Sequence, residues 1–108
     1  MSRRVILDEC LPRKLAALLD EEMVTTVPKH GWASKKNGDL LTIVSQEFDV
    51  FVTHDAKLEH QQNLQKFDIG IVVIHAKSNR LADIRPLIVE LNSAIASVTS
   101  QRVVHVGT

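Results

Sequence analysis

Residues 49–75, DVFVTHDAKLEHQQNLQKFDIGIVVIH, contain two apolar runs separated by a polar segment. The runs Asp49–Thr53 and Ile69–His75 are rich in Val, Ile and Phe, which is typical of buried strands. The segment between them, Leu58–Phe67, suits a short helix. Strand, helix and strand in this order indicate two parallel strands joined by a crossover.

The same alternation continues on both sides of this segment. Three further runs predict strands at Arg4–Leu7, Met23–Val27 and Arg102–Val106, and the polar alternation of the last one favours a sheet edge. Helices are predicted at Leu11–Leu19, from an Asn37 cap to about Glu47, and from near Ile84 to Val98, with Asp83 as cap and Pro86 in the first turn. The pattern predicts one α/β domain over residues 1–108, with three α/β/α layers around a mainly parallel sheet of about five strands.

Composition narrows the class of protein further. The chain has 108 residues, of which 44% are hydrophobic and 24% charged, with 13 Lys and Arg against 13 Asp and Glu. The high apolar content and the balanced charge exclude a disordered chain. Apolar runs such as Ile69–Ile74 are far shorter than the roughly 20 residues that cross a bilayer. The apolar start Val5–Leu7 is too short for a signal peptide, and the single Cys10 forms no internal disulfide. We therefore expect a cytoplasmic protein without a membrane partner.

Acidic residues fall where the predicted strands end. Asp8 and Glu9 follow the first strand, Asp55 follows the third, and Asp39 lies in the first turn of the second helix. In parallel sheets, the carboxyl ends of the strands form the functional crevice. Carboxylates gathered there repel one another unless a hard cation such as Mg²⁺ neutralises them, and such a site can activate a water and stabilise the leaving oxygen in phosphodiester hydrolysis. The structural alternative is that Asp8 caps a helix and Asp39 only interacts with a helix N-terminus.

Zero net charge means that nucleic-acid binding would need a local patch or a metal ion. Arg80, beside Asn79 after the fourth strand, could pair with a substrate phosphate or with a crevice carboxylate. His54 and Lys57 flank Asp55 and are further candidates for substrate contacts, together with the loop cations Lys35, Lys36 and Lys77. The alternative for each of these is a solvated loop side chain.

Several of these motifs together resemble the small bacterial PIN-like proteins related to VapC toxins. The resemblance rests on the segments Val5–Pro12 (VILDECLP), Gly31–Trp32, Asn37–Leu41 (NGDLL), Phe51–Asp55 (FVTHD), Gln61–Asn63 and Asn79–Leu81. It covers nearly the whole chain, and the opening LDExLP combined with a downstream TxD is its most specific part.

The resemblance implies a PIN fold and a ribonuclease site that uses Mg²⁺ or Mn²⁺. Asp8 would be the central metal ligand, Asp55 the second and Asp39 the acid from the middle helix, with Glu9 as a further catalytic acid. PIN domains often carry another acid after the TxD segment, and here Glu59 is the nearest one. The resemblance also implies an RNA substrate and a small antitoxin partner, and the polar last strand allows a homodimer.

Two other readings remain open. A receiver-like signalling domain also has an acidic pair after strand one and a phospho-acceptor aspartate after strand three, here Asp55. Receivers share a lysine after strand five, whereas this chain ends Val106–Thr108 (VGT). The second reading is a non-catalytic PIN-like binding module, whose carboxylates hold an ion or a partner's arginine without turnover.

Overall fold

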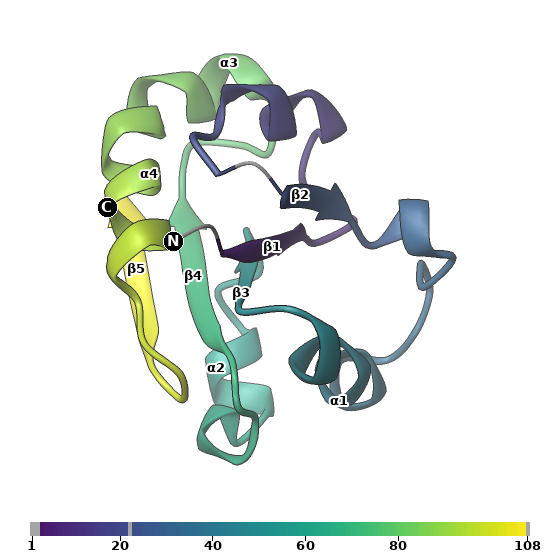
Figure 1. The fold of residues 1–108 in the computed structure, drawn as a ribbon. Helices are drawn as coiled ribbons and strands as arrows, with labels where there is room; N and C mark the ends of the chain where they lie inside the picture. The colour runs from purple at the N-terminus through teal and green to yellow at the C-terminus, as the bar shows by residue number, and fades with distance from the viewer. Residues whose placement is uncertain (1–2, 22, 108) are drawn as a thin grey trace.

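The computed structural model describes residues 3–21 and 23–107. Its centre is a five-stranded sheet in which all neighbouring strands are parallel (Figure 1). The strands are β1 (Arg4–Leu7), β2 (Met23–Thr26), β3 (Val50–Thr53), β4 (Gly70–His75) and β5 (Val103–Gly107). Their spatial order is β2-β1-β3-β4-β5. This confirms the predicted parallel sheet, and it places β5 at an edge as its polar alternation indicates.

Helical segments connect the strands and cover both faces of the sheet (Figure 1). The α-helices are α1 (Asn37–Glu47), α2 (Leu58–Gln61), α3 (Leu81–Ile84) and α4 (Ile88–Ser97). The 3₁₀ helices are η1 (Arg13–Leu18), η2 (Pro28–His30), η3 (Leu64–Lys66) and η4 (Arg85–Leu87). None of the helices in the described part of the chain is long and apolar enough to cross a membrane.

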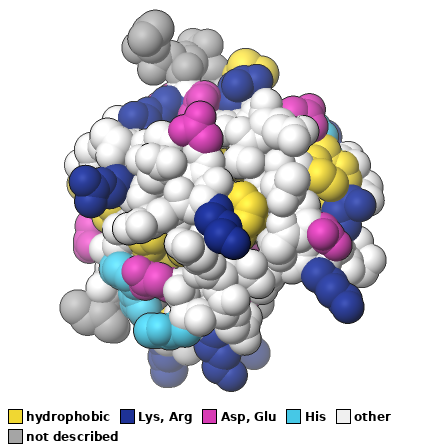
Figure 2. Space-filling model, turned by 90° about the horizontal axis from the view of Figure 1, so that it is seen from below, with side chains coloured by type: hydrophobic (Ala, Val, Ile, Leu, Met, Phe, Trp, Pro, Cys, Tyr) yellow, Lys and Arg dark blue, Asp and Glu magenta, His cyan; other side chains and the backbone are white. Residues whose placement is uncertain are grey.

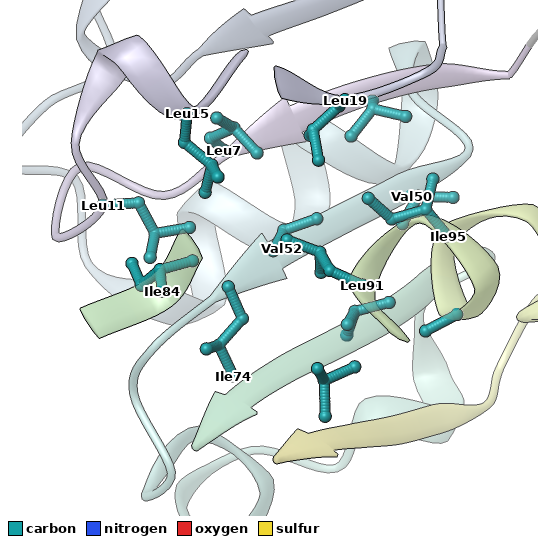
Figure 3. Packing of buried hydrophobic residues seen from close by; sticks show 14 of the residues in the cluster. Leu7, Leu11, Leu15, Leu19, Val50, Val52, Ile74, Ile84, Leu91 and Ile95 are labelled. Atoms are coloured by element: carbon teal, nitrogen blue, oxygen red, sulfur yellow. The ribbon is translucent and has the colours of Figure 1, made fainter. Parts of the chain in front are cut away.

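Two buried clusters hold the three layers together, one on each face of the sheet. Successive strand residues point to opposite faces, so Val5 and Leu7 of β1 join one cluster and Ile6 joins the other. The first cluster packs against η1, α3 and α4, and Figure 3 shows Leu15 and Leu91 meeting the sheet there. The second packs against α1, α2 and η3. Burial on both faces explains why the inner strands read as continuous apolar runs.

Two predicted helices are shorter than their sequence pattern indicates. The segment Leu11–Leu19 contains only the 3₁₀ helix η1, with Pro12 as its N-cap, because the chain is already extended again at Leu19 on its way to β2. The segment Leu58–Phe67 divides into α2 and η3, because Gln62 and Asn63 between them are extended.

Two helix starts also differ from the prediction. Asn37 is the first residue of α1 and not its cap, because the first helical hydrogen bond runs from the Leu40 N–H to the carbonyl of Lys36. The last helical region begins at Leu81 rather than near Ile84. Asp83 does not cap it, since Asp83 lies inside the helix and Arg80 is the N-cap; the Asp83 carboxylate accepts a hydrogen bond from the Ser78 hydroxyl. Pro86 lies in the 3₁₀ turn η4, where its missing N–H interrupts the regular α-helical pattern.

Candidate functional site

The carboxyl ends of β1 and β3 lie next to each other at the centre of the sheet. The chain leaves β1 toward β2 on one side, and it leaves β3 toward β4 on the other. The strand order therefore reverses between β1 and β3, which makes this point the topological switch of the fold. Open α/β sheets bind their ligands in the crevice outside such a switch point. Asp8 and Asp55, which follow these two strands, lie at this position.

Asp8 is fixed by hydrogen bonds at both its backbone and its side chain. Its N–H donates to the carbonyl of Val52 at 2.9 Å, which continues the β1–β3 ladder by one residue. One carboxylate oxygen accepts from the Glu9 N–H at 2.8 Å, and the other accepts from the Thr53 hydroxyl at 2.7 Å. The carboxylate is therefore held in one orientation before any ligand arrives.

Thr53 connects the two acids of the switch point. It is the last residue of β3 and is fully buried. Its hydroxyl donates to Asp8 and accepts from the Asp55 N–H at 3.0 Å, so one side chain ties the loop after β1 to the loop after β3. A carboxylate oxygen of Asp55 in turn accepts from the Lys57 N–H at 2.9 Å, which shapes the turn that leads into α2.

The Asp8 carboxylate is half-buried and has no cationic partner among the residues that the structure describes. Burial raises its pKa, with a smaller contribution from the charge of Glu9, and the hydrogen bonds from Thr53, Glu9 and Cys10 oppose the rise. Among residues 3–21 and 23–107, an ion pair joins Arg4 to Asp49 and a hydrogen-bonded pair joins His105 to Glu59, and neither includes Asp8. A desolvated carboxylate that no protein cation compensates is a favourable place for a bound cation.

The structure links Asp8 to Asp55 but does not gather all the predicted acids. Asp39 is exposed in the first turn of α1, and the Glu9 side chain is exposed and accepts a 3.4 Å hydrogen bond from the Ser34 N–H. Over the described ranges, no three His, Cys, Asp or Glu side chains form a group that could hold a metal ion. The three-carboxylate set Asp8, Asp39 and Asp55 therefore stays a prediction.

The predicted substrate-binding residues surround the switch point in different ways. Arg80 and Lys57 are exposed. Asn79 has a structural contact, because its amide donates to the carbonyl of Cys10 at 2.8 Å and so ties the loop after β4 to the loop after β1. A ring nitrogen of His54 lies 3.4 Å from the carbonyl of Ala76.

Cys10 lies against the same carboxylate, with its Sγ 3.6 Å from Asp8 and 3.8 Å from Thr53. Burial and the nearby charge of Asp8 raise the pKa of its thiol. Because the thiolate is the nucleophilic form, this environment does not favour a nucleophilic role.

Sequence reasoning missed the part that Thr53 plays. The motif TxD contains this residue, but only the fold shows that its hydroxyl bridges two loops. A usable signal was present, because a threonine that ends an otherwise apolar buried strand needs a hydrogen-bond partner.

Compared with protein-family models, curated proteins and solved structures, this chain finds no match. Membership of the PIN-like family is therefore a prediction from the motifs quoted above.

Proposed function

We propose that this chain is a PIN-like ribonuclease that uses Mg²⁺ or Mn²⁺ at a site centred on Asp8 and Asp55, and that it is the toxin-like member of a toxin–antitoxin pair. The observation that supports the site most strongly is the half-buried Asp8 carboxylate. It stands at the topological switch point, pairs with no cation in the described part of the chain, and is tied to Asp55 through Thr53.

The donor atoms of Asp8 and Asp55 fit a hard cation. Mg²⁺ is usually held by one or two carboxylates and completes its coordination with waters and substrate phosphates, so two acids suffice. When bound, such an ion lowers the pKa of an attacking water and neutralises charge at the scissile phosphate.

Individual side chains of the chain have distinct roles in this proposal. Asp8 supplies an ionised carboxylate, and the Thr53 hydroxyl keeps that carboxylate from rotating. Asp55 supplies the second carboxylate from the neighbouring loop. Arg80 and Lys57, which are exposed next to this edge of the sheet, would bind phosphates of the RNA backbone.

A local cationic groove supplies the positive charge for RNA binding that the zero net charge of the whole chain does not. On the face shown in Figure 2, cationic and anionic side chains are interspersed. A groove of about 620 Å³ between η1 and the β2 edge differs, because its described lining includes Arg13, Lys14 and Lys29 and no carboxylate. Leu11, three residues after Asp8, also lines it. The groove therefore offers a cationic path for an RNA backbone close to the site.

The proposal is tested by cleavage of a pool of single-stranded and structured RNAs with Mn²⁺, Mg²⁺ or EDTA. We expect metal-dependent cleavage by the wild type that is lost in Asp8→Asn and in Asp55→Asn. Asp20→Asn is the matched control, because Asp20 is exposed and precedes β2 at the opposite edge of the sheet. Metal binding without cleavage by the wild type would contradict the nuclease proposal and favour the non-catalytic binding module.

A receiver-like phospho-acceptor is the second candidate, and the strand order favours it. The order 2-1-3-4-5 is the one that receiver domains such as CheY adopt, with the acceptor aspartate after β3. Against it, β5 itself, Val103–Gly107, contains no lysine. Incubation with acetyl phosphate and Mg²⁺, followed by mass spectrometry, separates the two candidates. A phosphoryl group on Asp55 supports the receiver, and an unmodified chain that cleaves RNA supports the nuclease.

A further inference from the structure

A pair of histidines lies on β4 and β5, the two strands at the β5 side of the sheet, and is separate in sequence from the acids of the switch point. The Nε2 atom of His75 and the Nδ1 atom of His105 are 2.7 Å apart, and the two rings are tilted by 31° with their centroids 4.9 Å apart. The proposed nuclease function uses neither side chain.

The sheet register brings the two histidines together. His75 shares its face of β4 with Ile71 and Val73, and His105 shares its face of β5 with Val103. His105 is paired with Val73, one step along the face from His75. Each histidine therefore ends an apolar row on the face that α2 covers, and their side chains are diagonal neighbours on adjacent strands.

Glu59 of α2 fixes which nitrogen of His105 carries the proton. Its carboxylate lies 3.0 Å from the Nε2 atom of His105, and the two side chains are 40% and 44% exposed. Because a carboxylate only accepts hydrogen bonds, the hydrogen of the neutral ring lies on Nε2. The lone pair of Nδ1 then accepts a hydrogen bond from the Nε2–H group of His75. A metal ion bound to both nitrogens would take the place of that proton, which moves to Nδ1 of His75 or to solvent. A carboxylate behind one ring nitrogen is the arrangement that orients metal-binding histidines in proteins.

We propose that His75 and His105 bind a transition-metal ion such as Zn²⁺, with Glu59 orienting His105 from behind. Imidazole nitrogens suit Zn²⁺, whereas the carboxylates of the switch point suit Mg²⁺ and Mn²⁺. Two nitrogens on one tetrahedral ion at the usual bond lengths are about 3.4 Å apart, so the rings need to open by roughly 0.7 Å. Both rings lie near the surface and can make this movement. Since the residues that the structure describes add no third ligand to the group, water would complete the coordination of the ion.

Calorimetric titration of the full chain with Zn²⁺ tests the proposal. We expect one ion per chain, binding that is lost in His75→Gln and in His105→Gln, and affinity that falls at least about tenfold in Glu59→Gln. His60→Gln is the matched control, because His60 is also exposed on α2 next to Glu59. Unchanged affinity in His75→Gln or His105→Gln, or the absence of Zn²⁺ binding to the wild type, would overturn the site.

A second measurement on the wild type makes the test independent of variant folding. Nuclear magnetic resonance of the imidazole nitrogens should show Zn²⁺ shifting the Nε2 atom of His75 and the Nδ1 atom of His105. Shifts confined to other histidines would contradict the proposal. Because Asp8→Asn should leave both results unchanged, this site and the nuclease site can fail separately.

Discussion

At the scale of single residues, the candidate site lowers the stability of the fold mainly through Asp8. Burial raises the pKa of this carboxyl above its ordinary value of 3.8, so the folded chain holds the Asp8 proton more tightly than the unfolded chain does. The free energy of unfolding therefore falls as pH rises from the ordinary pKa to the raised one, and it stays reduced above that window. Ionised Asp8 destabilises the metal-free fold at neutral pH, which is a common property of functional groups.

This sign predicts that Asp8→Asn raises the melting temperature of the metal-free protein at pH 7. The gain should vanish as pH falls below the ordinary pKa of 3.8, where Asp8 becomes protonated in both states. Thermal unfolding in EDTA across this pH range measures the difference. Adding Mn²⁺ should then stabilise the wild type and not the variant. A variant that is less stable than the wild type by the same amount at every pH would contradict the sign.

The Thr53 hydroxyl gives a second prediction at this scale. Thr53→Val keeps the shape of the side chain but leaves an Asp8 oxygen and the Asp55 N–H without their partner, at a cost of about 1–3 kcal/mol in the free energy of unfolding. Thr53→Ser keeps the hydroxyl and is the control. Urea denaturation measures both variants. Equal losses in Val and Ser would assign the effect to the methyl group and not to the hydrogen bonds.

At the scale of elements, the contact between β4 and the end of α4 depends on a glycine. A Cβ atom on Gly70 would lie 2.9 Å from a Val98 methyl and 3.2 Å from the carbonyl oxygen of Thr99. Because Val98 is buried and has little room to move, we expect Gly70→Ala to lower the free energy of unfolding by roughly 1–3 kcal/mol.

Gly38 in α1 is the matched comparison. Its added Cβ would meet only the flexible end of Gln62, at 3.4 Å. Gly38→Ala should therefore raise the free energy of unfolding by roughly 0.5–1 kcal/mol, since alanine favours the helix. Chemical denaturation of the two variants side by side checks the pair, and opposite signs are expected. Changes of the same sign would mean that the packing around Gly70 adjusts more freely than these contacts indicate.

The strands and the extent of α1 could be predicted from the sequence, whereas the boundaries of the shorter helical segments could not. The apolar composition of runs such as Ile69–His75 indicates buried strands, because both faces of an inner parallel strand are covered. The shortening of the segment Leu11–Leu19 to the 3₁₀ helix η1 depends instead on where the chain must turn to pair β2 with β1. No local sequence pattern encodes where that turn must come, so tertiary structure determines the length of this helix.

At the scale of the whole molecule, the layer formed by α4 anchors one face of the sheet. Leu91 is fully buried in the cluster that Figure 3 shows, whereas Val89 in the same helix is 84% exposed. Leu91→Ala should cost about 2–5 kcal/mol and Val89→Ala should have little effect. Urea denaturation of both variants tests this. A large loss in Val89→Ala would show that this face of α4 is covered in solution.

In the candidate site, strand topology predicts some features and side-chain contacts determine the others. Asp8 and Asp55 lie at one edge of the sheet because the carboxyl ends of adjacent parallel strands share that edge, which follows from strand order alone. Three other contacts depend on side-chain positions that sequence spacing does not give. They are the bridge through Thr53, the hydrogen bond from Asn79 to the carbonyl of Cys10, and the pair of His75 and His105.

The most direct test of the account is a Mn²⁺ titration of the chain, followed by calorimetry. It is best made in a His105→Gln background, so that the proposed histidine site does not contribute. We predict binding of Mn²⁺ that Asp8→Asn abolishes, that Asp55→Asn weakens strongly and that the control Asp20→Asn leaves unchanged. Binding of equal affinity in Asp8→Asn and Asp20→Asn would contradict the placement of a cation site between β1 and β3.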